Sequence, residues 1–79
     1  MKYLSRGQEP KNKVAVLLSL TKIGENMQAG VYDHLCNNFT VTQAAVLNGL
    51  KSQNLSTAIS DLNAVAAKVE KLYELKVHG

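Results

Sequence analysis

Hydrophobic residues recur at helical intervals through the C-terminal third of the chain, which carries its most regular pattern. No glycine or proline lies between Leu50 and Gly79. Apolar residues spaced three and four positions apart lie on one face of a helix. The pattern predicts one long helix over about residues 52–75, with a lysine-rich face opposite the apolar one. The apolar positions are Leu55, Ala58, Leu62, Val65, Val69 and Leu72, and the stripe is widened by Ile59, Ala66 and Tyr73.

Two shorter apolar segments precede this helix. Residues 14–20 form an almost wholly apolar run that fits a buried strand or a buried helix equally well. A helix is favoured because no second strand-like run follows, and Gly24 is expected to end it. Residues 25–37 carry apolar side chains at helical spacing, and the pair Asn37-Asn38 suits the end of that helix. The chain is therefore predicted to be all-α, with four or five helices.

The segment between residues 40 and 50 predicts a short capped helix followed by a tight turn. Thr40 and Gln43 fit a capping box, in which the hydroxyl accepts one free N–H and the amide side chain reaches back to the cap. The helix that they open runs into Asn48-Gly49, a pair typical of tight turns. The sequence thus predicts a helix, a tight turn and a second helix in direct succession.

Small and apolar residues around this turn match the spacing of a helix-turn-helix. Ala45 lies four residues before Gly49 and is small enough for the second helix to cross close by. Gly49 tolerates a positive φ, Leu50 can pack beneath the turn, and Leu55 begins the buried side of the second helix. We therefore predict a tri-helical helix-turn-helix DNA-binding unit at about residues 41–60, supported by the preceding helix and continued by the long C-terminal one.

Hydrogen-bonding side chains occupy the outward positions at the start of the second helix, and no acidic residue occurs there before Asp61. Gln53 suits recognition of adenine, and Ser56 or Thr57 can reach a phosphate or the methyl group of thymine. The alternative is that these residues only cap and solvate an ordinary helix start. The predicted DNA-binding residues of this helix are Lys51, Ser52, Gln53, Ser56, Thr57 and Ser60.

Positive charge is concentrated before the first predicted helix. The chain carries nine basic and six acidic residues, a net charge of +3, and residues 1–13 alone hold four basic residues against one acidic. We predict a basic N-terminal arm at residues 1–9 that adds phosphate contacts, with a merely solvated terminus as the alternative. The predicted phosphate-binding residues of the arm and its junction with the first helix are Lys2, Arg6, Lys11 and Lys13.

Length and composition indicate one small domain over residues 1–79 and exclude several kinds of function. A single cysteine rules out an internal disulfide, and Cys36 with His34 lacks the further ligands of a zinc site. The glycines are isolated and form no phosphate loop, and no carboxylates are paired for acid–base chemistry. We therefore expect no enzyme activity, no cofactor, no metal and no small-molecule substrate.

The apolar runs are all shorter than the roughly 20 residues of a membrane span, and the first ten residues lack the apolar segment of a signal peptide. The expectation is a protein with no membrane association. It is expected in the cytoplasm, associated with the nucleoid if it binds DNA.

Three short motifs within residues 41–73 carry a resemblance to a known family: Leu55-Ser56-Thr57-Ala58-Ile59, Leu62 and Ala66-Ala67-Lys68-Val69. This stretch resembles the C-terminal part of the PapB-type adhesin-biosynthesis regulators, transcription regulators of fimbrial operons in enterobacteria. The resemblance implies an all-helical fold and oligomeric binding to A/T-rich double-stranded promoter DNA. It leaves the choice of groove open, because part of the family is associated with the minor groove. Asp61 departs from the family pattern, which suggests a basic or neutral residue there.

The apolar stripe of the long helix extends further than a domain of this size can cover. It fits the seam of a homodimer or higher oligomer, which is compatible with DNA binding. It also fits the partner groove of a helical protein–protein module, such as an adaptor or anti-activator. A plasmid- or phage-borne repressor with a similar tri-helical unit is a further alternative. The predicted oligomerisation residues are Leu62, Val65, Val69, Leu72 and Tyr73.

Overall fold

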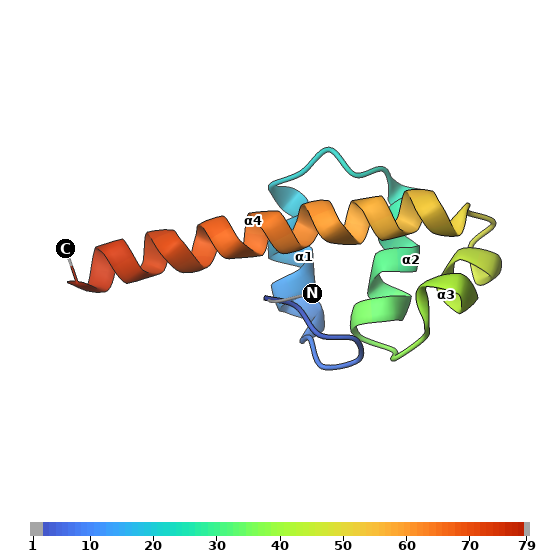
Figure 1. Ribbon diagram of the computed structural model, residues 1–79, viewed down its shortest axis with the longest axis horizontal. Coiled ribbons are helices and arrows are strands. Elements are labelled where there is room, and N and C mark those ends of the chain that lie inside the picture. The colour runs from blue at the N-terminus through green and yellow to red at the C-terminus, as the bar shows by residue number, and fades with distance from the viewer. Residues whose placement is uncertain (1–2, 79) are drawn as a thin grey trace.

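Four helices make up the fold of the computed structural model, which describes residues 3–78, with side-chain environments up to residue 75 (Figure 1). No strand occurs among the described residues, so the predicted all-helical class is confirmed. None of these helices combines the length and apolarity that a bilayer crossing requires. The helices are α1 (Lys11–Ser19), α2 (Glu25–Leu35), α3 (Val41–Leu47) and α4 (Ser52–His78).

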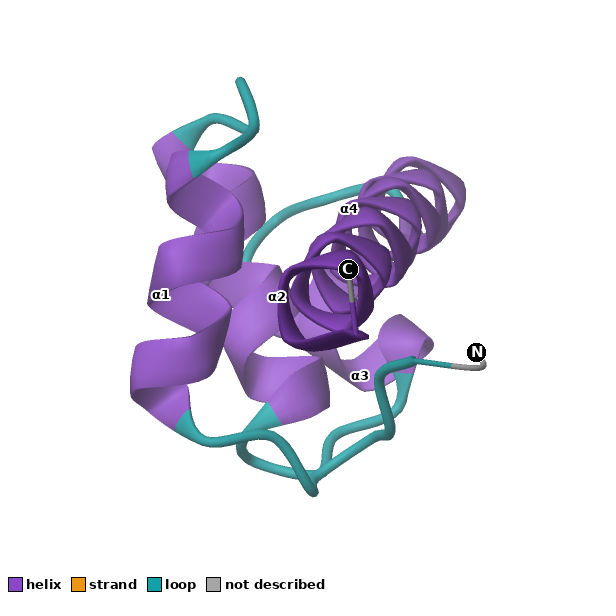
Figure 2. Ribbon diagram, turned by 90° about the vertical axis from the view of Figure 1, so that its left-hand side faces the viewer, coloured by secondary structure: helices purple, strands orange, loops and turns teal. Residues whose placement is uncertain are grey.

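The long helix α4 is the axis of the molecule, and α1, α2 and α3 all pack against it (Figure 2). Its 27 residues span about 40 Å, close to the 44 Å length of the whole chain. The shorter helices cover only its N-terminal part, so its C-terminal turns project from the domain (Figure 1). The predicted long helix is thus confirmed, and it continues slightly beyond the predicted end.

The core lies where the four helices meet, and it uses the apolar face that the sequence pattern predicted. Leu55 and Leu62, two turns apart on α4, are completely buried. They meet Val31 and Leu35 of α2 and Val14 of α1, which are also completely buried, in one hydrophobic cluster. Each such side chain stabilises the fold by about 1.5–3 kcal/mol. This cluster holds the start of α4 against the other helices.

The end of α1 differs from the prediction that placed it at Gly24. The helix ends at Ser19, because the N–H groups of Leu20 and Thr21 close the last turn with bonds to carbonyls three residues back. The Thr21 hydroxyl also donates to the Leu18 carbonyl, over 2.8 Å. Leu20 is 59% exposed, so the apolar run leaves the core face before Gly24. Gly24 instead precedes α2 as its N-cap.

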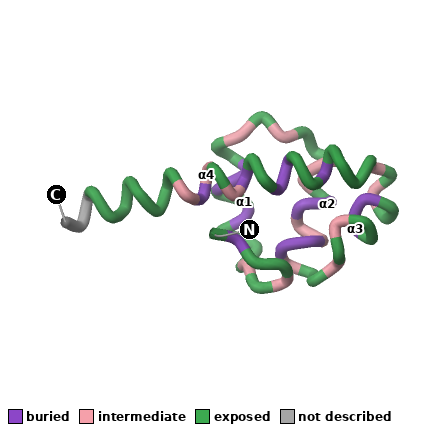
Figure 3. Tube along the Cα trace, viewed as in Figure 1, coloured by how far each residue is buried: buried purple, intermediate pink, exposed green. Residues whose placement is uncertain are grey.

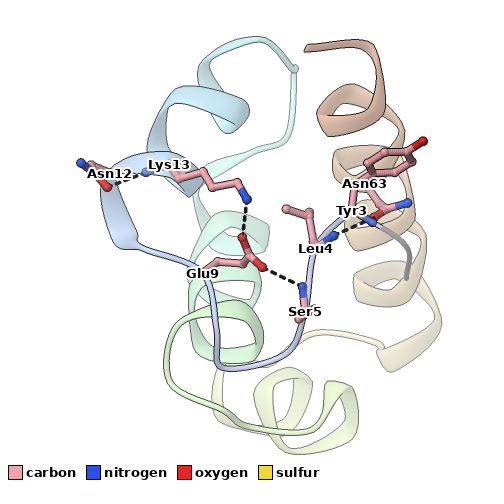
Figure 4. Close-up of polar contacts among 7 residues, drawn as sticks. All are labelled: Tyr3, Leu4, Ser5, Glu9, Asn12, Lys13 and Asn63. Carbon is pink, nitrogen blue, oxygen red and sulfur yellow. Dashed lines mark hydrogen bonds and ion pairs between the residues drawn. The ribbon is translucent and has the colours of Figure 1, made fainter. Parts of the chain in front are cut away.

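The segment predicted as a basic N-terminal arm is folded against the helices over residues 3–9 (Figure 4). Leu4 is buried in the core. The backbone N–H groups of Tyr3 and Leu4 donate to Asn63 Oδ1 of α4, over 2.9 and 3.1 Å. The N–H groups of Gly7 and Glu9 donate to the carbonyls that end α2. The segment has a buried anchor and paired backbone groups, so it is part of the domain; Lys2 lies outside the described residues.

Candidate nucleic-acid interface

The short helix α3 begins with the predicted capping box. The N–H of Gln43 donates to the Thr40 hydroxyl oxygen over 3.1 Å, and the N–H of Thr40 donates to Gln43 Oε1 over 3.0 Å. Two backbone groups that would otherwise lack partners at the helix start are thereby satisfied. Ala44 and Ala45 then pack their small side chains into the core. The beginning of α3 is therefore well defined, although the helix has only seven residues.

The turn between α3 and α4 has the hydrogen bonds of a Schellman motif. The N–H of Leu50 donates to the Ala45 carbonyl over 2.8 Å, and the N–H of Gly49 donates to the Val46 carbonyl over 3.3 Å. Gly49 has φ +64°, the left-handed conformation that a glycine adopts without a steric cost. The predicted tight turn at Asn48-Gly49 is confirmed. It brings the chain from α3 into α4 in four residues.

Helix α2 supports this turn through one polar contact and one close apolar contact. Asp33 Oδ2 accepts a hydrogen bond from the Asn48 side chain over 2.8 Å. A Cβ placed at Gly30 would lie 2.9 Å from a methyl carbon of Leu50 and 3.0 Å from one of Leu55. The absence of a Cβ at Gly30 thus lets the Leu50 and Leu55 side chains pack closely against α2. The three helices form a compact unit that presents the first turns of α4.

The outer face of these first turns is polar and exposed. Gln53, Ser56, Thr57 and Ser60 follow one another at intervals of three, one and three residues, which places them on one side of the helix, opposite the buried Leu55. Lys51 and Ser52 are exposed at the helix start. The structure therefore brings the six predicted residues of α4 together on an accessible surface. Helix α4 begins at Ser52 itself, so Ser52 is the first helical residue and not the cap.

The hydroxyl of Thr57 is turned back toward its own helix. It donates to the Gln53 carbonyl over 3.0 Å, and the residue is exposed. A hydroxyl held in this way donates no bond outward, although its oxygen still accepts. The outward chemistry of Thr57 is therefore its methyl group and an acceptor oxygen. A methyl group at this position suits contact with the methyl group of thymine.

The charge of this face is small and positive. Lys51 is the only charged residue between Thr40 and Ser60, and the next acidic residue is the exposed Asp61. Asp33 of α2 is distant in sequence but lies close to the turn in the fold. Its carboxylate accepts hydrogen bonds from the side chains of Asn37 and Asn48. A face with one cation neutralises few phosphates per copy. The electrostatic attraction that one copy of this face offers to a polyanion is therefore weak.

Of the predicted basic residues of the N-terminal region that the structure describes, Lys13 and Arg6 lie away from this face. Lys13 forms an ion pair with Glu9 over 2.7 Å and borders a groove beside Ala66 of α4. Ala66 is about 20 Å along the helix axis from Gln53. Arg6 donates from Nε to Asn38 Oδ1 over 3.2 Å, which holds it near the loop between α2 and α3. Lys11 is exposed on α1.

The predicted oligomerisation residues fall into two groups. Leu62 is completely buried in the core of its own chain, so the prediction that it lies in an oligomer seam is wrong. Val65 is partly buried and packs against the same core. Val69 is 40% exposed, and Leu72 and Tyr73 are each 67% exposed. Only these last three residues are available to a partner.

His34 is buried and Cys36 is half-buried. Nδ1 of the buried His34 lies 2.8 Å from the Phe39 carbonyl oxygen, which only accepts hydrogen bonds, so Nδ1 carries the proton. Partial burial raises the pKa of the half-buried Cys36 thiol, an effect that outweighs the nearby positive charge of Lys11. Among residues 3–78 no three histidine, cysteine or acidic side chains are grouped to hold a metal ion.

Two features of the site escaped the sequence prediction. The bond between Asp33 and Asn48 joins residues 15 positions apart, and no local pattern indicates it. Asn54 is also exposed in the first turn of α4. It lies in the same acid-free segment as Gln53, and that composition could have indicated Asn54 as a member of the polar face. Asn54 extends the polar surface to the side of the helix.

An apolar groove of about 380 Å³ lies along α3. Phe39, Val46 and Leu47 form its apolar lining, with Thr42 and Gln43 at its edge. Val46 is 75% exposed, and Leu47 is 63% exposed. This groove is a second accessible surface of the same unit.

Comparison with known proteins identifies no relative: no family model, no curated protein and no solved structure matches this chain.

Proposed function

We propose that this protein is a DNA-binding transcriptional regulator that contacts double-stranded DNA through the first turns of α4. One observation carries the proposal. An exposed, acid-free polar face stands at the start of the second helix of a helix–turn–helix arrangement, and a capping box, a Schellman turn and α2 hold that start in place. In helix-turn-helix proteins this part of the second helix contacts the bases.

Each side chain of the face has chemistry suited to one part of the duplex. The Gln53 amide both donates and accepts, as the edge of adenine requires. Ser56, Ser60 and the Lys51 ammonium suit phosphate oxygens, and the Thr57 methyl suits thymine. This set favours A/T-rich sites over G/C-rich ones, in agreement with the expectation drawn from the PapB-type resemblance. We extend the proposal to promoter DNA of a fimbrial or adhesin operon on the strength of that resemblance.

The adaptor or anti-activator alternative is less well supported. It requires the apolar stripe of residues 55–72 as a groove for a partner protein. Leu55, Ile59, Leu62 and Ala66 of that stripe are buried against α1 and α2 in the protein's own core. A partner can therefore bind only the remaining C-terminal part of the stripe. A plasmid- or phage-borne repressor would use the same face of α4 as a fimbrial regulator, and it would differ in its target site.

The test is a gel-shift titration with A/T-rich promoter DNA and a G/C-rich control at two salt concentrations. The proposal predicts preferential, salt-sensitive binding to the A/T-rich duplex. Lys51→Ala should weaken binding to both duplexes and reduce the slope of log affinity against log salt by about 0.9 per copy. Gln53→Ala should reduce the A/T preference, because it removes a base contact.

The matched control is Lys71→Ala, which removes an exposed lysine from the same helix about 30 Å further along its axis. It should leave both affinities unchanged. Absence of binding by folded protein at low salt, or equal losses with Lys51→Ala and Lys71→Ala, would contradict the proposal.

A further inference from the structure

The core face of α4 continues past the point where the domain ends. Leu62 and Ala66 are buried, and Val69 and Tyr73 follow them on the same line of the helix at intervals of three and four residues. Val69 is 40% exposed and Tyr73 is 67% exposed. The C-terminal turns of α4 extend beyond the other three helices and are largely exposed (Figure 3). Leu72, on the flank of this line, is also 67% exposed. These three side chains form an apolar ridge on the projecting tail.

An apolar groove lies directly beside this ridge. It has a volume of about 260 Å³ and runs between α1 and α4, with Val16 and Leu17 on one side and Ala66 and Val69 on the other. Lys13 and Glu70 stand at its edges. Val16 is 62% exposed, although it belongs to the most apolar segment of the chain. Val69 thus belongs to the groove and to the ridge at once.

The molecule exposes more surface than a compact monomer of its mass. Its accessible surface is 5390 Å², whereas a folded monomer of 8.6 kDa exposes about 4,700 Å². The excess of roughly 700 Å² is close to the roughly 800 Å² that each partner buries in a standard protein interface. The projecting part of α4 accounts for the elongated shape (Figure 1).

We infer that the ridge of one copy docks into the α1–α4 groove of a second copy, and that the second copy docks in the same way in return. A two-fold symmetric interface requires one continuous patch that is complementary to itself. Ridge and groove share Val69, so a single patch supplies both shapes. Charges of both signs alternate along the tail, where Glu70 and Glu74 are interspersed with Lys68, Lys71 and Lys76, and the groove lining includes Lys13 and Glu70. Acidic side chains of one copy can therefore face lysines of the other.

The role of the dimer rests on the proposed function. A second copy would supply a second set of phosphate and base contacts, which one weakly charged face needs. Its formation requires no DNA. An oligomeric state measured without DNA can therefore contradict the dimer while DNA binding holds, and the reverse is also possible.

Sedimentation velocity of the full chain across the micromolar range tests the dimer. The expected result is a reversible transition from 8.6 kDa to twice that mass. Tyr73→Ser removes the ridge and Val16→Ser removes one wall of the groove; each should weaken dimerisation roughly tenfold or more, as loss of an interface hot spot does. Both side chains are exposed, so both variants should retain the helical circular dichroism of the wild type. If one variant fails to fold, the other still tests the interface.

The matched control is Leu75→Ser. It also removes an exposed apolar side chain from the tail, but on the side of the helix opposite Tyr73. It should dimerise like the wild type. Mixing the Tyr73→Ser and Val16→Ser variants should restore part of the affinity, because one intact ridge then meets one intact groove. A protein that stays monomeric, a dimer that neither variant weakens, or a mixture with no recovery would overturn reciprocal docking.

Discussion

Asn48 Nδ2 donates a hydrogen bond to Asp33 Oδ2 and a second one to the Ala44 carbonyl oxygen, each over 2.8 Å. One side chain thus connects the end of α3 to α2. Because Asn48 is also the C-cap of α3, this contact helps to set the direction in which the chain enters α4. The orientation of the proposed DNA-binding face depends on it.

Replacing Asp33 by alanine should lower the free energy of unfolding by about 1–3 kcal/mol, because it removes a charged acceptor from a part-buried amide. Asn48→Ala should have a similar effect. Urea denaturation of both single variants and the double variant measures their coupling, which we expect at about 1 kcal/mol. Strictly additive losses would show that the two residues act independently.

Gly49 provides a second test of the turn. Its φ of +64° strains any residue with a Cβ, and no atom lies within 4 Å of the position that a Cβ would take. Gly49→Ala should therefore cost about 1–2 kcal/mol from backbone strain alone. Gly49→Asn should recover much of that loss, since asparagine tolerates the left-handed region. Equal stability of the alanine variant and the wild type in urea denaturation would contradict the assigned turn conformation.

Leu62 and Leu72 occupy the same predicted stripe but have opposite environments. Leu62→Ala should lower the free energy of unfolding by about 2–5 kcal/mol, because it leaves a cavity in the core. Leu72→Ala should change the stability of the monomer by less than about 0.5 kcal/mol, since the side chain is 67% exposed. Thermal unfolding at low protein concentration, where a dimer is dissociated, measures both. A large loss with Leu72→Ala under those conditions would place the tail within the monomer core.

Local features of the fold could be predicted from the sequence because their causes are local. Thr40 and Gln43 are three residues apart, and the capping box that they form depends on that spacing alone. The turn at Gly49 and the length of α4 follow in the same way from a left-handed glycine and from a long segment free of glycine and proline. The six polar residues at the start of α4 were placed on one surface for the same reason.

Contacts between distant segments could not be predicted from spacing. The missing side chain of Gly30 leaves room for Leu50 and Leu55, which lie 20 and 25 residues further along the chain, and no local spacing indicates that contact. Residues 3–9 looked like a free basic arm, but Leu4 has a pocket and Asn63 binds the backbone 59 residues away. The stripe of α4 is uniform in sequence, so only the point where α1 and α2 end separates core residues from tail residues.

Acidification should loosen the N-terminal segment through Glu9. Partial burial by itself raises the pKa of Glu9, but hydrogen bonds from Lys13 and the Ser5 N–H, together with the charge of Lys13, outweigh it and lower the pKa below its ordinary value of 4.5. The ionised form therefore stabilises the folded state at neutral pH. This contribution is present above the unfolded pKa and is lost as pH falls through the lower folded value.

Between about pH 5 and pH 3, the thermal midpoint of the wild type should fall more steeply than that of a Glu9→Gln variant. Circular dichroism melts at a series of pH values measure the two slopes. Parallel curves would show that the Glu9–Lys13 pair contributes nothing that depends on protonation.

The most direct measurement of DNA contact is a titration of ¹⁵N-labelled protein with an A/T-rich promoter duplex, followed by amide chemical shifts. DNA binding through α4 predicts the largest changes at residues 51–60, with the Gln53 side-chain amide among them, and small changes along the projecting tail. Shifts confined to the tail or to the α3 groove, or no shifts from folded protein at low salt, would contradict a DNA-binding face on the first turns of α4.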